Sequence, residues 1–225
     1  AAICTGCIQR GNGLSAGRDL FFRRYRNPSG MQLSARYSGR YRPFKERGRG
    51  NGMAIVRKPF AAAVCGVKNS GKTTLLEKLI KEFIRRGYRV AVVKHDGHEF
   101  QADTEGTDTF RMQKAGAYGT CIFSDTKWMA VKQESQVSLE ELFDLFKEAD
   151  VILAEGMKAS SLPKLEVVRK GISNESVCCR ENLLALVTDT DLQVPDVPVL
   201  GLEEVCACVD LLEREMHRRT EESCW

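Results

Sequence analysis

Residues 66–73 combine glycine, lysine and threonine at a spacing that suits phosphate binding. The segment reads Gly-Val-Lys-Asn-Ser-Gly-Lys-Thr and fits the phosphate-loop pattern G-x-x-x-x-G-K-[ST] at every fixed position. In such a loop, successive backbone N–H groups surround an anion at a helix N-terminus, where the helix dipole also favours negative charge. We expect Lys72 to reach the β- and γ-phosphates of a nucleoside triphosphate, and the Thr73 hydroxyl to bind Mg²⁺. The remaining nucleotide-binding candidates in the loop are Gly66, Asn69, Ser70, Gly71 and Thr74.

The segments on either side of this loop have the patterns of a strand and a helix, which is the context that a phosphate loop needs. Residues 61–65 are a short apolar run suited to a buried strand, and residues 75–83 place apolar side chains at helical spacing ahead of Gly87. Residues 88–94 are rich in β-branched side chains, so we expect a second strand that is covered on both faces. The chain therefore contains a β–α–β unit, and sheets of this kind bind ligands at the carboxyl ends of their strands.

The rest of the chain supplies further strands and helices. Ser138-x-x-Glu141 is a capping-box match that opens a helix. Residues 120–124 and 128–133 flank a turn and predict a β-hairpin rather than another crossover. Further strands are expected at residues 151–156, 164–169, 183–187 and 198–200, and further helices at 107–115 and 202–216. Because polar and apolar residues alternate in 164–169, we expect that strand to be half-exposed. The predicted fold class is α/β, a three-layer P-loop NTPase fold with a mixed, mostly parallel sheet and a β-hairpin insertion.

Acidic side chains follow several of these strands and are candidates for binding Mg²⁺ or a base. Glu155 ends an apolar run typical of a buried strand, which is the place of the Walker B acid. We expect it to support Mg²⁺ and to orient the attacking water. Glu155 and Lys72 are the expected catalytic residues. Asp103 is a further candidate Mg²⁺ ligand. Asp189, with Asp191 as the alternative, follows a late strand, and a carboxylate there can accept both N1–H and N2–H₂ of guanine. The competing interpretation is an ordinary turn acid.

Histidines and basic residues extend the candidate site. His95 and His98 are three residues apart in a loop near the expected γ-phosphate. They can contact phosphate, a second ligand or a metal ion, or can be simple hydrogen-bonding groups. Arg111, Lys158 and Arg169 offer positive charge for a second phosphate-bearing ligand, and solvated basic side chains are the alternative.

The chain divides by charge into a basic front and an acidic remainder. Of the 34 Lys/Arg and 30 Asp/Glu in 225 residues, 11 and 2 lie in residues 1–52, which leaves 23 and 28 for residues 53–225. The front has no helical or alternating pattern. We interpret it as upstream sequence read through in frame before Met53, with a disordered native tail or an RNA-binding arm as alternatives. The predicted P-loop domain spans residues 53–217, and a polar tail follows at 218–225.

The cysteines and the lack of a long apolar run indicate in which compartment of the cell the protein is expected. No stretch approaches the roughly 20 apolar residues that a membrane-spanning helix needs, so no membrane contact is expected. An enzyme that works beside cytosolic nucleotide pools keeps its thiols reduced, so we expect a cytoplasmic protein whose nine cysteines form no disulfides. Cys65 and Cys121 lie in apolar runs and are expected in the core. A structural zinc site would need the fold to bring Cys178-Cys179 and Cys206-x-Cys208 together.

The order of motifs between residues 61 and 209 resembles the molybdopterin-guanine dinucleotide biosynthesis protein B (MobB) family. This family belongs to a wider group of P-loop GTPases that includes the nitrogenase iron protein and metallochaperone GTPases. The phosphate loop alone identifies no family, but the segments that follow it are specific in combination. They are Lys94-His95-Asp96-Gly97-His98, Asp108-Thr109-Phe110-Arg111 leading to Ala115-Gly116-Ala117, Glu155-Gly156-Met157-Lys158, and Pro163-Lys164-Leu165-Glu166-Val167-Val168-Arg169.

The resemblance implies a GTP-binding, weakly GTP-hydrolysing adaptor that needs Mg²⁺ and forms a homodimer. It also implies two partners in molybdenum cofactor biosynthesis. These are molybdopterin and the molybdopterin guanylyltransferase that attaches GMP to it, whereas no nucleic-acid partner is expected. Two other classes stay open. A small-molecule kinase shares the loop but usually has an arginine-rich lid, which residues 53–225 lack, and a metallochaperone GTPase would use the histidines and cysteines to bind metal.

Overall fold

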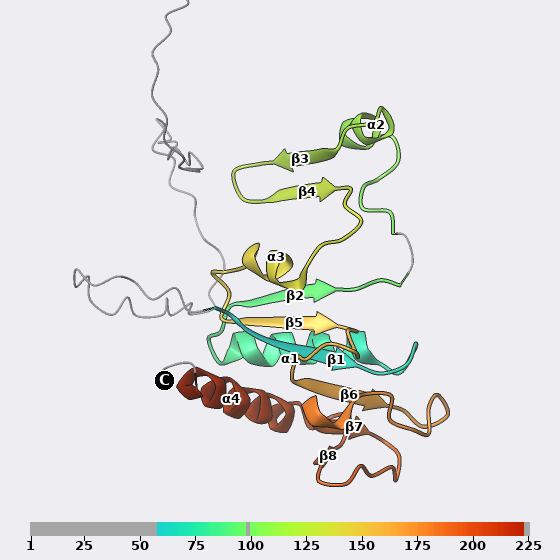
Figure 1. Cartoon of the computed structure of the whole chain (residues 1–225), viewed down its shortest axis with the longest axis vertical. Coiled ribbons are helices and arrows are strands. Elements are labelled where there is room, and N and C mark those ends of the chain that lie inside the picture. Colours follow the sequence, from blue (N-terminus) through green and yellow to red (C-terminus); the bar gives the residue numbers. More distant parts are fainter. Residues whose placement is uncertain (1–57, 98–99, 223–225) are drawn as a thin grey trace, which may run out of the picture. The chain divides into compact units, whose positions relative to one another are not determined.

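Six parallel strands form the central sheet of the computed structural model, which describes residues 58–97 and 100–222 (Figure 1). Every pairing between neighbouring strands is parallel, so the carboxyl ends of the strands lie at one edge of the sheet. All of the described residues belong to one unit of the fold. The strand order is β2 (Val90–Lys94), β5 (Val151–Glu155), β1 (Phe60–Cys65), β6 (Lys164–Val168), β7 (Leu183–Thr188) and β8 (Val199–Leu200).

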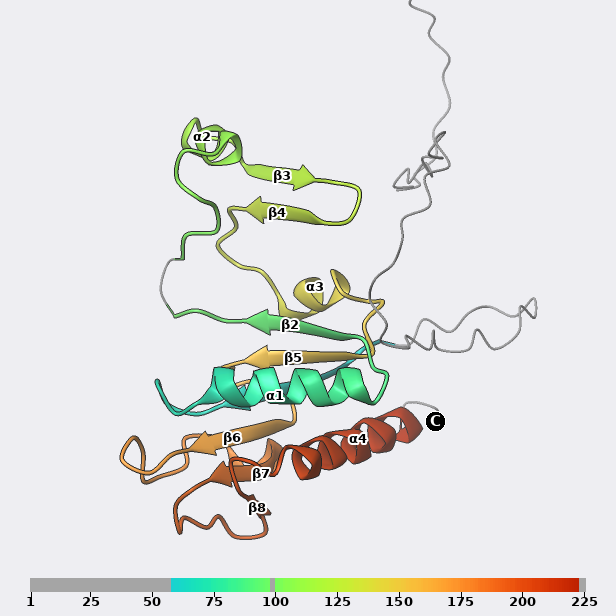
Figure 2. The same ribbon diagram turned by 180° about the vertical axis from the view of Figure 1, so that it is seen from behind.

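Two helices, α1 (Lys72–Arg85) and α4 (Val205–Glu222), pack on the same face of this sheet (Figures 1 and 2). A single hydrophobic core joins them to the strands because alternate strand residues point to that face. Helix α1 is followed by its C-cap residue Arg86 and then by Gly87, whose φ of +93° favours glycine. Members of the core include Val64, Leu153, Leu165 and Val187 of the sheet, Leu79 and Phe83 of α1, and Val209 and Leu212 of α4.

The segment between β2 and β5 contains two short helices and a β-hairpin. Helix α2 (Asp108–Lys114) begins at Thr107, whose side chain accepts a hydrogen bond from the Phe110 N–H. Helix α3 (Leu139–Asp144) begins at Ser138 with a complete capping box to Glu141. The hairpin strands β3 (Gly119–Phe123) and β4 (Trp128–Lys132) pair antiparallel in a sheet of their own. A short 3₁₀ helix (Arg180–Asn182) precedes β7.

The predicted α/β fold is confirmed, and so are the β–α–β start, the hairpin and the mostly parallel sheet. The antiparallel part of the predicted mixed sheet is the hairpin, which stays separate from the six parallel strands. No helix in the described ranges is long and apolar enough to span a membrane. Residues 1–52 and Met53, where we placed the domain boundary, lie outside the described residues.

Three predictions about individual segments were wrong. The strand expected to be half-exposed at residues 164–169 is β6, and all five of its residues are buried because its two charged side chains are satisfied by loops. Cys121 was expected in the core but is exposed on β3, since both faces of the hairpin are open. The closing helix was expected to end at residue 216, but α4 continues to Glu222, with ion pairs from Arg218 to Glu215 and Glu222 along its last turns.

Candidate functional site

The phosphate loop connects β1 to α1 at the carboxyl edge of the sheet, and its backbone explains its glycines. Gly66 has φ +136°, and a Cβ on it would lie 2.4 Å from the Val167 carbonyl oxygen and 2.7 Å from Ser70 Oγ. Asn69 and Gly71 also have positive φ, at 64° and 99°. Glycine adopts such angles without strain, and asparagine tolerates them better than most residues. The loop can therefore turn tightly against β6.

The end of α1 that faces this loop has unpaired hydrogen-bond donors. Its N-cap residue, Gly71, offers no side-chain cap, and the first turn carries no acidic residue. Ser70 is fully buried, and its Oγ has no hydrogen-bond partner among the described residues. Lys72 lies across the loop, where its Nζ donates to the Val67 carbonyl oxygen at 2.6 Å. Amide, hydroxyl and ammonium donors gathered at a helix N-terminus fit the oxygens of a phosphate group.

Two oxygen-bearing side chains meet beside the loop where a magnesium ion would be expected. The Thr73 hydroxyl donates to Glu155 Oε1 at 3.1 Å, and Lys94 Nζ lies 3.9 Å from Glu155 Oε2. Glu155 is the last residue of β5, which pairs with β1 on one side and with β2 on the other. Mg²⁺ usually takes one or two protein oxygens and completes its octahedron with water and substrate phosphates. A threonine hydroxyl next to a carboxylate fits that requirement.

On the other side of the loop, the ends of β6 and β7 bring two more candidates together. Arg169 follows β6, and its Nη1 lies 3.4 Å from the position that a Cβ on Gly71 would take. Asp189 follows β7, and its Oδ1 accepts a hydrogen bond from the Lys170 N–H at 2.7 Å. Its other carboxylate oxygen is not used in this contact. Asp191, the alternative base reader, is exposed two residues further along the chain.

Buried polar groups on β1 and β6 hold the loops around the site through hydrogen bonds that the sequence did not predict. Glu166 is fully buried and accepts from Ser176 Oγ and from the Val177 N–H, at 2.5 and 2.6 Å. Lys164 is also fully buried, and its Nζ donates to the Ser160 carbonyl oxygen at 2.6 Å. Cys65, which was correctly expected in the core, donates from Sγ to a carbonyl oxygen in the loop after β5. An alternating charged–apolar pattern alone does not show that the charged side chains find hydrogen-bond partners in the protein interior.

The other candidate Mg²⁺ ligand, Asp103, is engaged elsewhere. Its carboxylate accepts from Thr109 Oγ1, from the Thr104 N–H and from Thr107 Oγ1, all near the start of α2. These hydrogen bonds, with that of Thr109 the strongest, hold the pKa of Asp103 below its ordinary value. Within the described ranges, no hydrogen bond or ion pair joins Asp103 to Thr73 or Glu155.

The remaining candidates are on the surface. His95 is exposed directly after β2, and its backbone N–H donates to the Glu155 carbonyl oxygen at 3.3 Å. Arg111 lies on α2 and pairs with Asp108 at 3.5 Å. Lys158 is exposed in the loop after β5, and Thr74 is exposed in the first turn of α1. His98 lies outside the described residues.

The cysteines considered for zinc do not come together. Cys178 packs beside Cys65 next to the phosphate loop, whereas Cys206 lies on α4 with its Sγ 3.8 Å from a carboxylate oxygen of Glu82 on α1. Among the described residues, no group of three or more His, Cys, Asp or Glu side chains is arranged to hold a metal ion. The fold therefore does not form the zinc site that the two cysteine pairs suggested.

The parallel sheet, its flanking helices and the phosphate loop between β1 and α1 define a protein of the P-loop NTPase fold. A family model described as "Molybdopterin guanine dinucleotide synthesis protein B" (MobB) matches residues 61–189. The chain belongs to the MobB family, which confirms the resemblance seen in its motifs.

Individual relatives agree with this assignment. The "Molybdopterin-guanine dinucleotide biosynthesis adapter protein" of Haemophilus influenzae is 35% identical over 157 residues, which are 68% of this chain and 88% of the relative. The Escherichia coli protein of the same name is 30% identical over 67% of this chain and 89% of its own length. The crystal structure of Bacillus subtilis MobB aligns with a TM-score of 0.56 at 26% identity, and the alignment covers 67% of this chain and 96% of that one.

Proposed function

We propose that this protein is a GTP-binding, weakly GTP-hydrolysing adapter in the biosynthesis of molybdopterin guanine dinucleotide. The observation that carries the proposal is the phosphate loop with Thr73 and Glu155 in hydrogen-bond contact beside it, in a chain of the MobB family. The relatives named above are adapter proteins of this pathway, which supports the pathway and the accessory role. GTP and Mg²⁺ are the proposed ligands.

The geometry supports roles for Ser70, Lys72, Thr73 and Glu155. The amide groups at the start of α1, Lys72 Nζ and the buried Ser70 hydroxyl would bind phosphate oxygens, and Lys72 would exchange its bond with the Val67 carbonyl for one with the nucleotide. Thr73 and Glu155 would hold Mg²⁺ directly or through water, and Glu155 would orient the attacking water. When bound, the ion would neutralise charge on the terminal phosphates.

The strand order suggests how the nucleotide lies across the sheet edge. Glu155 is at the end of β5, on one side of β1, whereas Asp189 is at the end of β7, beyond β6 on the other side. A nucleotide with its β-phosphate in the loop would then have its metal-bound end near β5 and its base near β7. The hydrogen bond from the Lys170 N–H fixes Asp189 Oδ1 and leaves lone pairs of the carboxylate for the guanine N–H groups.

Titration calorimetry with GTP and ATP in the presence of Mg²⁺ tests this proposal. We expect the wild-type protein to prefer GTP, the Lys72→Ala variant to lose binding of both nucleotides, and the Asp189→Asn variant to lose the preference, because an amide cannot accept two donors in parallel. Asp191→Asn is the matched control for Asp189. A preference for ATP would overturn the guanine assignment and favour a small-molecule kinase. No binding of either nucleotide would overturn the proposal itself.

The adapter role implies partners and a place of action. We propose that the protein binds molybdopterin guanylyltransferase and presents nucleotide or molybdopterin to it in the cytoplasm, where GTP is available. His95, His98, Arg111 and Lys158 are the candidates for contacts with the second ligand. We also propose that it acts as a homodimer. Co-purification of the guanylyltransferase with this chain, compared with the Lys72→Ala variant, would show whether the complex depends on nucleotide.

A further inference from the structure

Arg169 lies beside the phosphate loop and has no counter-ion among the described residues. Its Nη1 is 3.4 Å from the position of a Cβ on Gly71, the N-cap residue of α1. The other described arginines each direct the guanidinium to a carboxylate or to a carbonyl oxygen. Among the arginines that the structure describes, Arg169 alone has neither partner.

The surroundings of this guanidinium favour an anion. The N-terminus of a helix carries a partial positive charge, so a cation next to it is unfavourable unless negative charge is bound between them. The first turn of α1 has no acidic residue to supply that charge, and it contains Lys72. A second and independent observation is the buried Ser70 Oγ, which has no partner among the described residues. Two basic side chains, Arg169 and Lys72, and the unpaired Ser70 hydroxyl thus belong to one loop and its immediate surroundings.

The backbone around Arg169 is held by hydrogen bonds, so the point from which this exposed side chain extends is defined. Its carbonyl oxygen accepts from the Ile172 and Ser173 N–H groups, both at 3.0 Å, and the N–H of the next residue is bonded to Asp189. Three residues earlier, Glu166 pairs in register with Cys65 of β1. An arginine presented by such a rigid turn loses less entropy when it binds a ligand.

The topology indicates which part of a nucleotide Arg169 can reach. Strand β1 has β5 on one side, which carries the Mg²⁺ candidate Glu155, and β6 on the other, which leads into Arg169. Mg²⁺ held by Thr73 and Glu155 would neutralise charge at the terminal phosphates. We propose that Arg169 is a nucleotide-binding residue that contacts the α/β-diphosphate from the β6 side of the loop, opposite Glu155. This inference rests on the proposed function, because it requires a nucleotide in the loop.

Calorimetry on the full chain with GTP, GDP and inorganic pyrophosphate tests the inference. Arg169→Ala is expected to lower the affinity for all three ligands by a similar factor, roughly ten- to a hundredfold, because a charge-assisted hydrogen bond to the shared diphosphate is lost. Arg169→Lys should recover part of the affinity, since it keeps the charge but not the planar fork. Arg214→Ala removes an exposed arginine of α4 that donates to the Asp210 carbonyl oxygen and takes no part in the proposed site, so it is the control, with a change below about threefold.

A melting curve of the ligand-free protein separates ligand binding from a structural role. Removing an uncompensated cation beside a helix N-terminus should leave the melting temperature unchanged or raise it slightly. A lower melting temperature in Arg169→Ala, or GDP and pyrophosphate affinities equal to those of the wild type, would overturn the inference. An effect on GTP alone would also overturn it, because it would place Arg169 at the γ-phosphate. If Lys72→Ala loses GTP binding and Arg169→Ala binds GTP as the wild type does, this inference fails while the proposed function stands.

Discussion

Gly66 illustrates how much of the site depends on single residues. Replacing it with alanine would put a methyl group 2.4 Å from the Val167 carbonyl oxygen at a φ of +136°. Gly87 is the matched control, because its φ is +93° but nothing lies within 4 Å of its Cβ position. We expect Gly87→Ala to lower the unfolding free energy by about 1 kcal/mol and Gly66→Ala by about 3 kcal/mol, since only the latter adds a backbone clash to the strain. Urea denaturation measures both. Equal losses of unfolding free energy in the two variants would show that β6 shifts to accommodate the methyl group.

Thr73 provides a second test at the residue scale, directed at the metal ion. In the Thr73→Val variant the hydroxyl that contacts Glu155 Oε1 is lost, whereas Thr73→Ser keeps it. We therefore expect valine to reduce the gain in GTP affinity that Mg²⁺ provides, by about tenfold, and serine to preserve most of that gain. Binding is compared in excess Mg²⁺ and in a chelator. If the valine variant responds to Mg²⁺ as the wild type does, Thr73 is not a ligand.

The sequence predicted the residues of the loop better than it predicted their surroundings. The loop is a contiguous pattern whose glycines and lysine have fixed backbone tasks, so Gly66 to Thr73 could be assigned directly. The contact of Thr73 with Glu155 joins residues 82 positions apart, and only the assumption of a P-loop fold predicted it. Asp103 shows the limit of such reasoning. Nearby threonines at the start of α2 satisfy its carboxylate, and nothing in its sequence pattern separates that role from metal binding.

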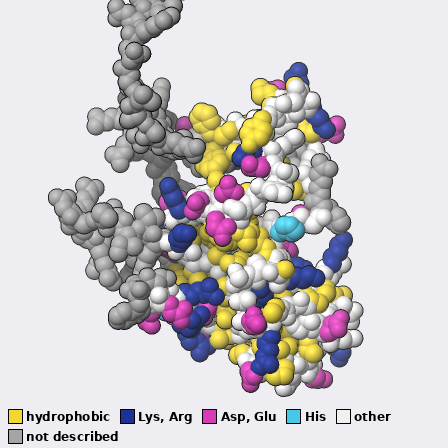
Figure 3. Space-filling view, viewed as in Figure 1, with side chains coloured by type: hydrophobic (Ala, Val, Ile, Leu, Met, Phe, Trp, Pro, Cys, Tyr) yellow, Lys and Arg dark blue, Asp and Glu magenta, His cyan; other side chains and the backbone are white. Residues whose placement is uncertain are grey.

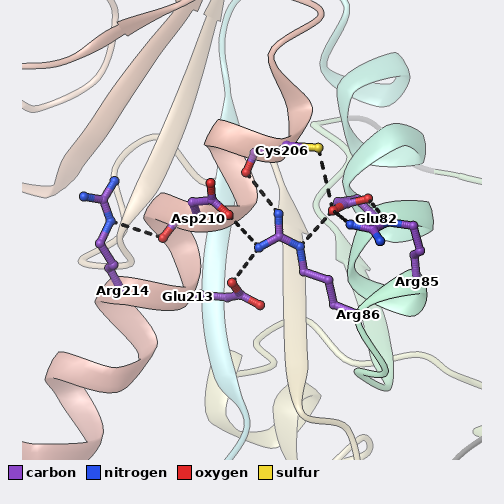
Figure 4. Close-up of polar contacts among 7 residues, drawn as sticks. All are labelled: Glu82, Arg85, Arg86, Cys206, Asp210, Glu213 and Arg214. Atoms are coloured by element: carbon purple, nitrogen blue, oxygen red, sulfur yellow. Dashed lines mark hydrogen bonds and ion pairs between the residues drawn. The ribbon is translucent and has the colours of Figure 1, made fainter.

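At the scale of elements, α1 and α4 are joined by an arginine with three acidic partners (Figure 4). The Arg86 guanidinium lies 2.8 Å from Glu82 of α1 and 2.6 Å from both Asp210 and Glu213 of α4. It also donates to the Cys206 carbonyl oxygen. Glu82 in turn accepts from Arg85. The centre of the network is shielded from water, with 18% of the Arg86 side chain and 10% of that of Glu82 exposed, whereas Arg85 and Asp210 at its rim are exposed. The bonds of Arg86 to both helices fix the position of α4 on α1.

This network predicts a pH-dependent contribution to stability. Hydrogen bonds from Arg85 and Arg86 lower the pKa of Glu82 from 4.5 to about 2. Between these values the unfolded chain binds the proton and the folded protein does not, so the contribution is complete above about pH 5 and is lost as the pH falls toward 2. Removing the charge in Glu82→Gln should therefore destabilise the protein at neutral pH, and the difference from the wild type should shrink in acid.

Urea midpoints measured from pH 7 down to pH 3 would test this expectation. Glu203→Gln is a suitable control because Glu203 pairs with Lys78 at 2.7 Å but is 83% exposed. Exposed pairs contribute little, so this variant should track the wild type closely at all pH values. A Glu82→Gln deficit that stays constant down to pH 3 would mean that the lost hydrogen bonds, rather than the charge, account for the effect.

The accuracy of the predicted elements follows from how local their signals are. Strands β1, β5 and β7 are short apolar runs buried on both faces, and α3 opens with a capping box, so all four could be predicted within a residue or two. Strand β6 was placed correctly but given the wrong exposure. The reason is that Ser160, Ser176 and Val177, which satisfy its two charged residues, come from loops that have no pattern of their own.

At the scale of the whole molecule, the hairpin leaves an apolar surface uncovered. Phe123 is 81% exposed and its cross-strand partner Trp128 is 62% exposed, while Ile122 is exposed on the opposite face of the hairpin. Tyr118, directly before β3, is 66% exposed. Figure 3 shows hydrophobic side chains gathered over β3 and β4. An isolated two-stranded sheet is only marginally stable in water, and an exposed apolar patch of this kind usually marks a contact with another chain. In the proposed homodimer, a second copy of the same hairpin would supply such a contact.

The homodimer can be tested with charges placed on the hairpin. Phe123→Asp combined with Trp128→Asp should convert the dimer to monomer, because the free energy needed to bury two carboxylates exceeds the free energy that the apolar contact provides. Ile84→Asp is the matched control, since Ile84 is a 59% exposed apolar residue on α1, away from the hairpin. Sedimentation velocity at micromolar concentration gives the mass of each variant, and GTP titration shows that the monomeric variant is still folded around its loop. A wild-type protein that sediments as a monomer would refute the homodimer, and a double variant that remains dimeric would move the interface away from β3 and β4.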